Sequence, residues 1–112
     1  MYQRSLGYKT EEYVKQYYIA KWRKYVISNF TIRWWEIDLI FSNSTTVLFI
    51  EVKCINSLES IHNYITPKKR IAMKKTILTY FSRTKEMRVP RIDIVFVKNG
   101  TIYTIVENCT DF

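Results

Sequence analysis

The stretch that decides the fold runs from residue 35 to residue 53, WEIDLIFSNSTTVLFIEVK. It holds two apolar runs, residues 35–41 and 46–53, whose β-branched and aromatic residues are typical of strands. The polar cluster SNST at residues 42–45 favours a turn between them. We therefore predict a β-hairpin in the middle of the chain.

Three acidic residues interrupt these strands, and a strand's geometry relates their positions. Side chains alternate along a strand, so Glu36 and Asp38 should share one face of the first strand, and Glu51 and Lys53 one face of the second. With residues 43–46 as a four-residue loop, Asp38 lies opposite Glu51 and Glu36 opposite Lys53. This register predicts that the carboxylates of Asp38 and Glu51 are close, with Cβ atoms within about 5 Å.

Such a carboxylate pair has a specific chemical use. Two carboxylates at this separation repel each other and raise the pKa of one, and a divalent cation removes that repulsion. Oxygen ligands suit Mg²⁺ or Mn²⁺, which activates water and polarises a phosphoryl oxygen. Lys53 can hold that water and offset charge in the transition state. Asp38, Glu51 and Lys53 thus suit phosphodiester hydrolysis; the alternative is a solvated hairpin with a Glu36–Lys53 ion pair and no catalysis.

Two amphipathic helices are predicted on either side of the hairpin. The first covers about residues 10–24 and has Thr10 as its N-cap, and the second begins at Thr66-Pro67 and ends near residue 83. The residues expected on the apolar stripes are Val14, Tyr18, Trp22 and Tyr25 in the first helix, and Ile71, Leu78 and Phe81 in the second.

Three further strands complete the pattern. Residues 25–33 alternate between two faces, and residues 92–98 and 101–106 flank Asn99-Gly100, a strong hairpin signal. Residues 54–65 are polar and irregular, as in a loop. The predicted order is α-β-β-β-α-β-β, an α/β fold in which two helices flank one mixed sheet, with residues 1–112 as a single domain.

Composition excludes several classes of protein. The chain has 112 residues, of which 47% are apolar, with only two Gly and two Pro, so neither disorder nor a fibrous repeat fits. An apolar run of about 18 residues is missing, and the start MYQRS is unlike a secretory signal. Cys54 and Cys109 match no metal motif, and the only histidine, His62, is expected on a surface loop. A reduced, cytoplasmic protein without a His-based triad is expected.

The charge of the chain indicates a polyanionic partner. Eighteen Lys and Arg face ten Asp and Glu, a net charge of +8. Residues 66–91 hold nine of the basic residues and one acid, Glu86. Nucleic acid is the preferred partner of this basic segment. The alternatives are a solvated helix face with no partner, an acidic protein and an anionic membrane. The membrane ranks last because the apolar stripe of the helix is needed for the core. The residues expected to contact phosphates are Lys68, Lys69, Arg70, Lys74 and Lys75.

Three segments resemble the YraN-like UPF0102 family: WEIDLI at residues 35–40, FIEVK at 49–53 and RIDIV at 91–95. The resemblance covers about residues 7–106. That family belongs to the PD-(D/E)XK, restriction-endonuclease-like superfamily, which includes the archaeal Holliday-junction resolvases with their similar strand-turn-strand core. The resemblance implies a restriction-endonuclease-like fold and a metal-dependent nuclease.

The resemblance also implies roles for single residues. Asp38 and Glu51 match the metal-binding carboxylates and Lys53 the catalytic lysine. Gly7 and Glu11 match a Gly-x-x-x-Glu motif whose glutamate lies on the first helix and points toward the metal site.

Other positions of the resemblance leave alternatives open. Lys69 matches a lysine at the start of the later helix, where a catalytic role, a phosphate contact or plain solvation are all open. The family usually has a glycine directly before the Glu-Ile-Asp run, where this chain has Trp34-Trp35. The two indoles are expected either to crowd the entrance to the metal site or to stack on bases. The alternative for at least one of them is packing in the core. Asp93 fits the pattern but lies on another strand, where a structural role is expected.

The expected function is that of a Mg²⁺-dependent (or Mn²⁺-dependent) endonuclease that hydrolyses phosphodiester bonds in nucleic acid. We expect it to recognise the structure of its substrate and to act on DNA in preference to RNA. The alternatives are a nucleic-acid-binding domain that keeps the fold without catalysis, and an interaction module whose basic face docks an acidic protein. A homodimer is left open by analogy with superfamily relatives that cut two strands.

Overall fold

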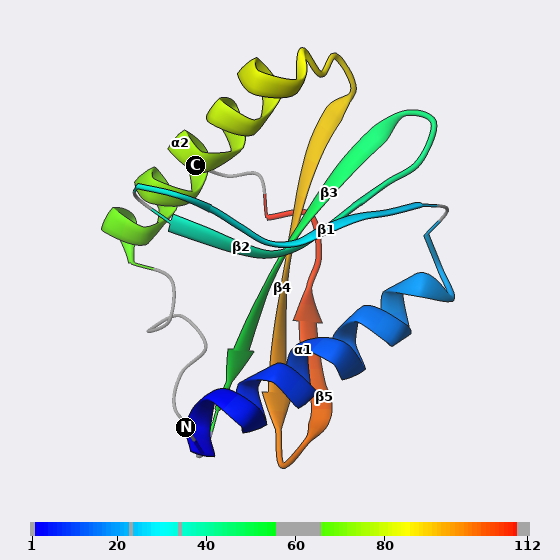
Figure 1. Cartoon of the computed structure of the whole chain (residues 1–112), viewed down its shortest axis with the longest axis vertical. Coiled ribbons are helices and arrows are strands. Elements are labelled where there is room, and N and C mark those ends of the chain that lie inside the picture. The colour runs from blue at the N-terminus through cyan, green and yellow to red at the C-terminus, as the bar shows by residue number, and fades with distance from the viewer. Residues whose placement is uncertain (1, 23, 34, 56–65, 110–112) are drawn as a thin grey trace.

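A computed structural model describes residues 2–22, 24–33, 35–55 and 66–109 (Figure 1). The described chain forms two helices and five strands in the predicted order, which confirms the α/β class. The elements are α1 (Tyr2–Ile19), β1 (Lys24–Ile32), β2 (Trp35–Ser42), β3 (Thr46–Cys54), α2 (Pro67–Thr84), β4 (Val89–Lys98) and β5 (Thr101–Val106). His62 and Trp34 lie outside the described residues, so the predictions made for them stay predictions.

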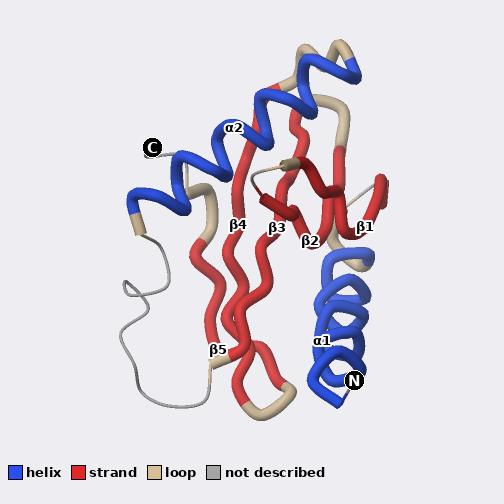
Figure 2. The backbone as a smooth tube through the Cα atoms, turned by 60° about the vertical axis from the view of Figure 1, so that its left-hand side comes forward, coloured by secondary structure: helices blue, strands red, loops and turns tan. Residues whose placement is uncertain are grey.

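The five strands form one mixed sheet in the order β1-β2-β3-β4-β5. Neighbouring strands are antiparallel except β3 and β4, which are parallel because α2 carries the chain back between them. Helix α2 lies on one side of the sheet and α1 on the other (Figure 2). The predicted arrangement of a mixed sheet flanked by two helices is therefore confirmed.

Each face of the sheet has its own hydrophobic core, and β3 contributes to both. Val47 and Phe49 pack on the α2 side, whereas Leu48 and Ile50 pack on the α1 side. All four are almost fully buried. A central strand that is covered on both faces has to be apolar at every covered position, which explains the continuous run VLFI at residues 47–50.

The first helix differs from the prediction at both ends. It runs from Tyr2 to Ile19, so Thr10 is a buried residue inside it and not its N-cap. The chain leaves the helix in a tight turn, in which the N–H of Trp22 donates to the carbonyl of Tyr18 at 2.8 Å.

The predicted apolar stripe of this segment nevertheless packs on one core. Val14 and Tyr18 are buried there from α1, and Trp22 and Tyr25 reach the same core from the turn and from β1. The helical spacing therefore identified the core residues correctly. It also made the predicted helix too long at its C-terminal end, because Trp22 of the turn and Tyr25 of β1 continue the same spacing.

The second helix has the predicted ends. The N–H of Lys69 donates to the hydroxyl of Thr66 at 3.2 Å, Pro67 occupies the first turn, and Lys85 ends the helix in the left-handed conformation at φ 54°. Because the cap satisfies a terminal N–H and Pro67 has none to satisfy, this end needs little further support.

The face that α2 turns toward the sheet is not the predicted one. Ile71 and Leu78 are 58% and 59% exposed, and only Phe81 of the predicted stripe packs against the core. The residues that α2 buries are Met73, Thr76, Ile77 and Tyr80. From the sequence, an anionic membrane was ranked last among the partners because the apolar stripe of this helix was expected to be buried in the core. That expectation is wrong for Ile71 and Leu78.

Both predicted hairpin turns are present. At the first, the side chain of Asn43 accepts from the N–H groups of Thr45 and Thr46 at 2.9 and 2.8 Å, a local bond that Asn favours in turns. At the second, Asn99 and Gly100 have φ of 53° and 76°, and Lys98 pairs with Thr101. Two central residues with positive φ make the tight turn whose twist matches the flanking strands.

Candidate metal centre

The hairpin of β2 and β3 opens into a fork at Asp38. The strands pair in the predicted register from Ser42–Val47 to Leu39–Ile50, and beyond that pair they separate (Figure 1). In place of the next backbone bond, the N–H of Val52 donates to the carboxylate of Asp38 at 2.7 Å. The Asp38 side chain therefore takes over the acceptor position that backbone would otherwise fill.

The alternation of β2 also breaks at this point. Ile37 packs on the α2 side and Leu39 on the α1 side, although residues two apart on a regular strand share a face. On the neighbouring strand, Asn29 has φ 55°, which is uncommon for a residue other than Gly. The local irregularity turns Asp38 into the fork, where it is only 7% exposed.

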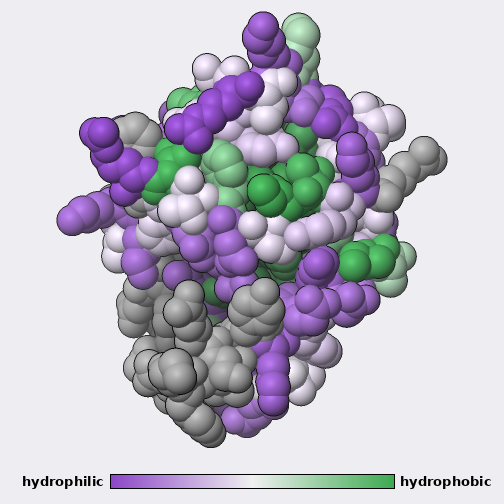
Figure 3. All heavy atoms as spheres, in the orientation of Figure 1, coloured by the Kyte–Doolittle hydropathy of each residue, from purple (hydrophilic) through white to green (hydrophobic). Residues whose placement is uncertain are grey.

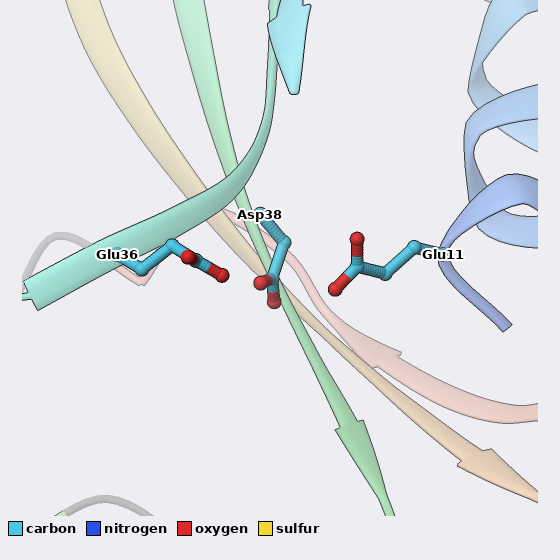
Figure 4. A group of neighbouring side chains, drawn as sticks. All are labelled: Glu11, Glu36 and Asp38. Atoms are coloured by element: carbon cyan, nitrogen blue, oxygen red, sulfur yellow. The ribbon is translucent and has the colours of Figure 1, made fainter. Parts of the chain in front are cut away.

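Three carboxylates meet at the fork. Glu11 of α1 and Glu36 and Asp38 of β2 each bring one oxygen within 4.8 Å of the others (Figure 4). The structure thus brings together Glu11 and Asp38, two of the predicted site residues. Glu36 was predicted to share a face with Asp38 but not to belong to the site, and it is the acid that sequence reasoning missed.

Asn29 and Thr31 of β1 hold two of these carboxylates in place. The amide of Asn29 donates to Glu11 at 3.1 Å and to Glu36 at 3.3 Å, and the hydroxyl of Thr31 donates to Glu36 at 3.1 Å. Sequence reasoning did not select either residue. The sequence indicates only that both residues lie on the same face of the first predicted strand. It does not indicate which acidic residues that face contacts.

Glu51, the second predicted metal ligand, lies next to Asp38. The two side chains share a hydrogen bond, and the pKa of Asp38 is raised to about 9, mainly by burial and then by the hydrogen bond and the charge of Glu51. The Val52 N–H acts in the opposite direction. Glu51 also accepts from the indole N–H of Trp35 at 2.6 Å.

Glu11 is affected in the same direction as Asp38. Its pKa is raised, chiefly by burial, and the negative charges of Asp38 and Glu36 add to the effect while Asn29 opposes it. The neighbouring negative charges therefore make ionisation of Glu11 and of Asp38 more costly.

Lys53 lies beside Glu51 as the alternation predicted. Its ammonium nitrogen is 5.3 Å from the centroid of the Trp35 ring, and Trp35 also contacts Glu51. Within the described ranges, no ion pair joins Lys53 to Glu36. The pairing of Glu36 with Lys53 expected in the alternative interpretation does not form, because β2 and β3 have separated before they reach these residues.

Asp93 is a structural residue, as its position on another strand suggested. Its buried carboxylate accepts from the hydroxyl of Tyr18 at 2.9 Å, from Arg91 at 3.0 Å and from the N–H of Asn108 at 3.0 Å. These bonds join α1, β4 and the segment after β5. With both oxygens engaged, this carboxylate supports the packing of α1 on the sheet.

The basic residues predicted to contact phosphates lie on α2. Lys68, Arg70, Lys74 and Lys75 are exposed and Lys69 is partly covered. Hydrophilic side chains project along this part of the surface, with hydrophobic side chains exposed between them (Figure 3). Helix α2 carries no acidic residue, so all of its charged side chains are positive.

The fold and the site together define a class: an α/β protein with a carboxylate cluster where two strands of a mixed sheet separate. The model of the uncharacterised protein family UPF0102 matches residues 10–97, and the chain belongs to that family. The membership that the hairpin motifs indicated is therefore confirmed. In the described part of the chain, no helix is long and apolar enough to cross a membrane.

Individual UPF0102 proteins are similar over most of the chain. One from Helicobacter pylori strain Shi470 is 36% identical over 107 residues, covering 96% of this chain and 92% of its own. One from Carboxydothermus hydrogenoformans is 29% identical over 118 residues and covers both chains completely. One from Helicobacter hepaticus is 39% identical over 82 residues, 73% of each chain.

Proposed function

We propose that the protein is a divalent-metal-dependent endonuclease of the PD-(D/E)XK, restriction-endonuclease-like kind to which the archaeal Holliday-junction resolvases belong. The observation that carries the proposal is the carboxylate cluster at the fork. Glu11, Glu36 and Asp38 bring oxygens within 4.8 Å of one another, and Glu51 shares a hydrogen bond with Asp38.

The donor set fits a hard cation. All four side chains offer oxygen and none offers nitrogen or sulfur, which favours Mg²⁺ or Mn²⁺ over zinc or copper. Asp38 and Glu51 would hold the ion, and Glu11 and Glu36 supply further oxygens. When bound, such an ion lowers the pKa of a coordinated water and polarises a phosphoryl oxygen.

The remaining residues act on the substrate. Lys53 lies on the same face of β3 as Glu51, from which its ammonium group can hold the attacking water and offset the charge that develops on the phosphoryl oxygens. The basic surface of α2 would bind the phosphate backbone without reading sequence. On this proposal the enzyme recognises the structure of its substrate, and acts on DNA in preference to RNA.

The proposed function places the protein in the cytoplasm, where it has access to nucleic acid. Cys54 and Cys109 are both free thiols. A homodimer would place two such sites on one duplex, in which case both strands can be cut.

The test is cleavage of a panel of duplex, branched and single-stranded DNA and RNA in Mg²⁺ or Mn²⁺. Lys53→Ala should reduce the cleavage rate by about 100-fold or more. Lys21→Ala is the matched control, because Lys21 also lies over an aromatic ring, that of Tyr17 at 4.8 Å, but in the turn after α1. Equal cleavage by wild type and Lys53→Ala across the panel would overturn the proposal.

The second candidate is a nucleic-acid-binding domain without catalysis, and it is favoured by the basic residues of α2, which has no acidic residue. It predicts binding that weakens steeply with salt and survives Asp38→Asn, with no metal-dependent cleavage. An acidic-protein partner would instead be displaced by competing nucleic acid.

A further inference from the structure

We propose that Trp35 is a positioning residue that orients Glu51 and Lys53, and thereby sets how tightly the carboxylates at the fork hold a divalent cation. The inference rests on the proposed metal-dependent function. It adds a residue that belongs to neither the carboxylate cluster nor the predicted catalytic set.

The contact with Glu51 carries the first part of the argument. The indole N–H donates to one carboxylate oxygen of Glu51 at 2.6 Å, a short bond of the kind that a charged acceptor forms. The indole thereby fixes the position of one oxygen of Glu51. Carboxylates that bind metals are commonly held by such a donor behind them, and losing it lowers metal affinity by about 10- to 100-fold.

The contact with Lys53 carries the second part. The ammonium group lies 5.3 Å from the centroid of the Trp35 ring, within the range of a cation–π interaction. A single indole therefore touches two adjacent functional side chains of β3. It restricts both to one side of the fork.

The position of Trp35 explains why a side chain is needed here. Trp35 begins β2, and the backbone pairing of β2 with β3 ends at Leu39–Ile50. Across the opened part of the hairpin, side chains make the connections: Asp38 to Val52, and Trp35 to Glu51. The ring is itself held, because it packs against the core on the α2 side.

The test compares Mn²⁺ binding by wild type, Trp35→Phe and Trp22→Phe, measured by calorimetry or electron paramagnetic resonance. Trp35→Phe keeps a ring under Lys53 and removes only the donor, so Mn²⁺ affinity should fall about 10-fold or more. Trp22→Phe is the matched control, since Trp22 stacks on Arg91 at 5.6 Å from the ring centroid and should leave the affinity unchanged.

A spectroscopic readout separates positioning from a general structural effect. The chain has three tryptophans, so its ¹H–¹⁵N spectrum holds three indole N–H signals, which single Trp→Phe variants assign. The Trp35 signal should move in Glu51→Gln without any metal and on addition of Mg²⁺ to wild type. The Trp22 signal should stay in place in both experiments.

The outcomes distinguish the two claims. If wild type and Trp35→Phe bind Mn²⁺ equally well and the Trp35 signal does not move in Glu51→Gln, the role of Trp35 is overturned. The proposed metal site is then unaffected. Wild type that binds no Mn²⁺ overturns the proposed metal-dependent function, and this inference with it. Weaker binding by Trp35→Phe alone, with its melting temperature near that of wild type, supports the proposal.

Discussion

The backbone N–H of Val52 donates to the carboxylate of Asp38 at 2.7 Å, at the point where β2 and β3 stop pairing. One aspartate thus completes the hairpin and belongs to the carboxylate cluster. The carboxyl group is buried, and burial is the largest cause of its raised pKa, against which the Val52 N–H acts. Structure and chemistry at the fork are therefore coupled through Asp38.

The stability of the metal-free protein should fall as pH rises. The pKa of Asp38 rises from 3.8 to about 9 on folding, so between these values the folded state keeps a proton that the unfolded state has lost. Stability therefore decreases with pH in this window, by up to about 1.4 kcal/mol per pH unit. Thermal melts of the metal-free protein from pH 5 to pH 9 measure the decline.

Asp38→Asn is the variant that isolates this effect. Its amide resembles the protonated acid, still accepts from Val52 and can donate to Glu51, so its melting temperature should exceed that of wild type increasingly toward pH 9. Melting curves that change in parallel for wild type and Asp38→Asn would show that Asp38 is not the group responsible.

Tyr18→Phe should destabilise the fold without affecting the metal site. The variant removes the 2.9 Å bond from the Tyr18 hydroxyl to the buried carboxylate of Asp93, at a cost of about 1.5–3 kcal/mol for a bond to a charged group. Urea unfolding measures the loss. Tyr17→Phe, on the same helix but 36% exposed, should change little; equal losses in both variants would contradict the assigned role of Asp93.

Thr66→Ala should cost about 1 kcal/mol of stability, because the N–H of Lys69 loses its capping hydroxyl. Thr66→Ser keeps the hydroxyl and should remain within a few tenths of a kcal/mol of wild type. Chemical unfolding of the two variants is the measurement. A Thr66→Ser variant as unstable as Thr66→Ala would mean that the cap does not support α2.

Removing charge from α2 should weaken nucleic-acid binding and its dependence on salt. Each lost phosphate contact on duplex DNA lowers the slope of log K against log salt by about 0.9. Lys68, Lys74 and Lys75 are exposed, and their triple replacement by Gln should reduce the slope by up to three such steps. Fluorescence anisotropy across a salt series gives the slope.

The control carries the same charge change on the other side of the sheet. Replacement of Lys9, Lys21 and Lys24 by Gln alters α1, the following turn and the start of β1. A reduction of the salt slope equal to that of the α2 variant would show that binding follows net charge and not the basic surface of α2.

The sequence was sufficient for the hairpin because its signals are local. Alternation and the polar turn predicted the pairing of Ser42 with Val47, and this register brings Asp38 and Glu51 together. Glu36 could not be assigned to the cluster, because strand alternation does not reveal that β2 separates from β3. The contacts that bring Glu36 into the cluster come from Asn29 of β1, which also bonds Glu11 of α1, and strand alternation shows neither of them.

The helices show the same limit. A Thr followed by two acids is an N-cap signature, but Thr10 lies inside a helix that begins at Tyr2. Helix α2 has two apolar stripes, and periodicity alone does not say which one meets the sheet. The sheet accepts the stripe of Met73 and Ile77, and it leaves Ile71 and Leu78 exposed beside the lysines.

The central claim is that the carboxylates at the fork bind a divalent cation. Its most direct test is a crystal soaked in Mn²⁺ and measured for anomalous scattering at the manganese edge. We predict a peak within about 2–2.5 Å of carboxylate oxygens of Asp38 and Glu51, the distance range of hard-cation ligands, and its loss in Asp38→Asn crystals. A map of the soaked wild-type crystal with no peak among Glu11, Glu36, Asp38 and Glu51 would contradict the claim.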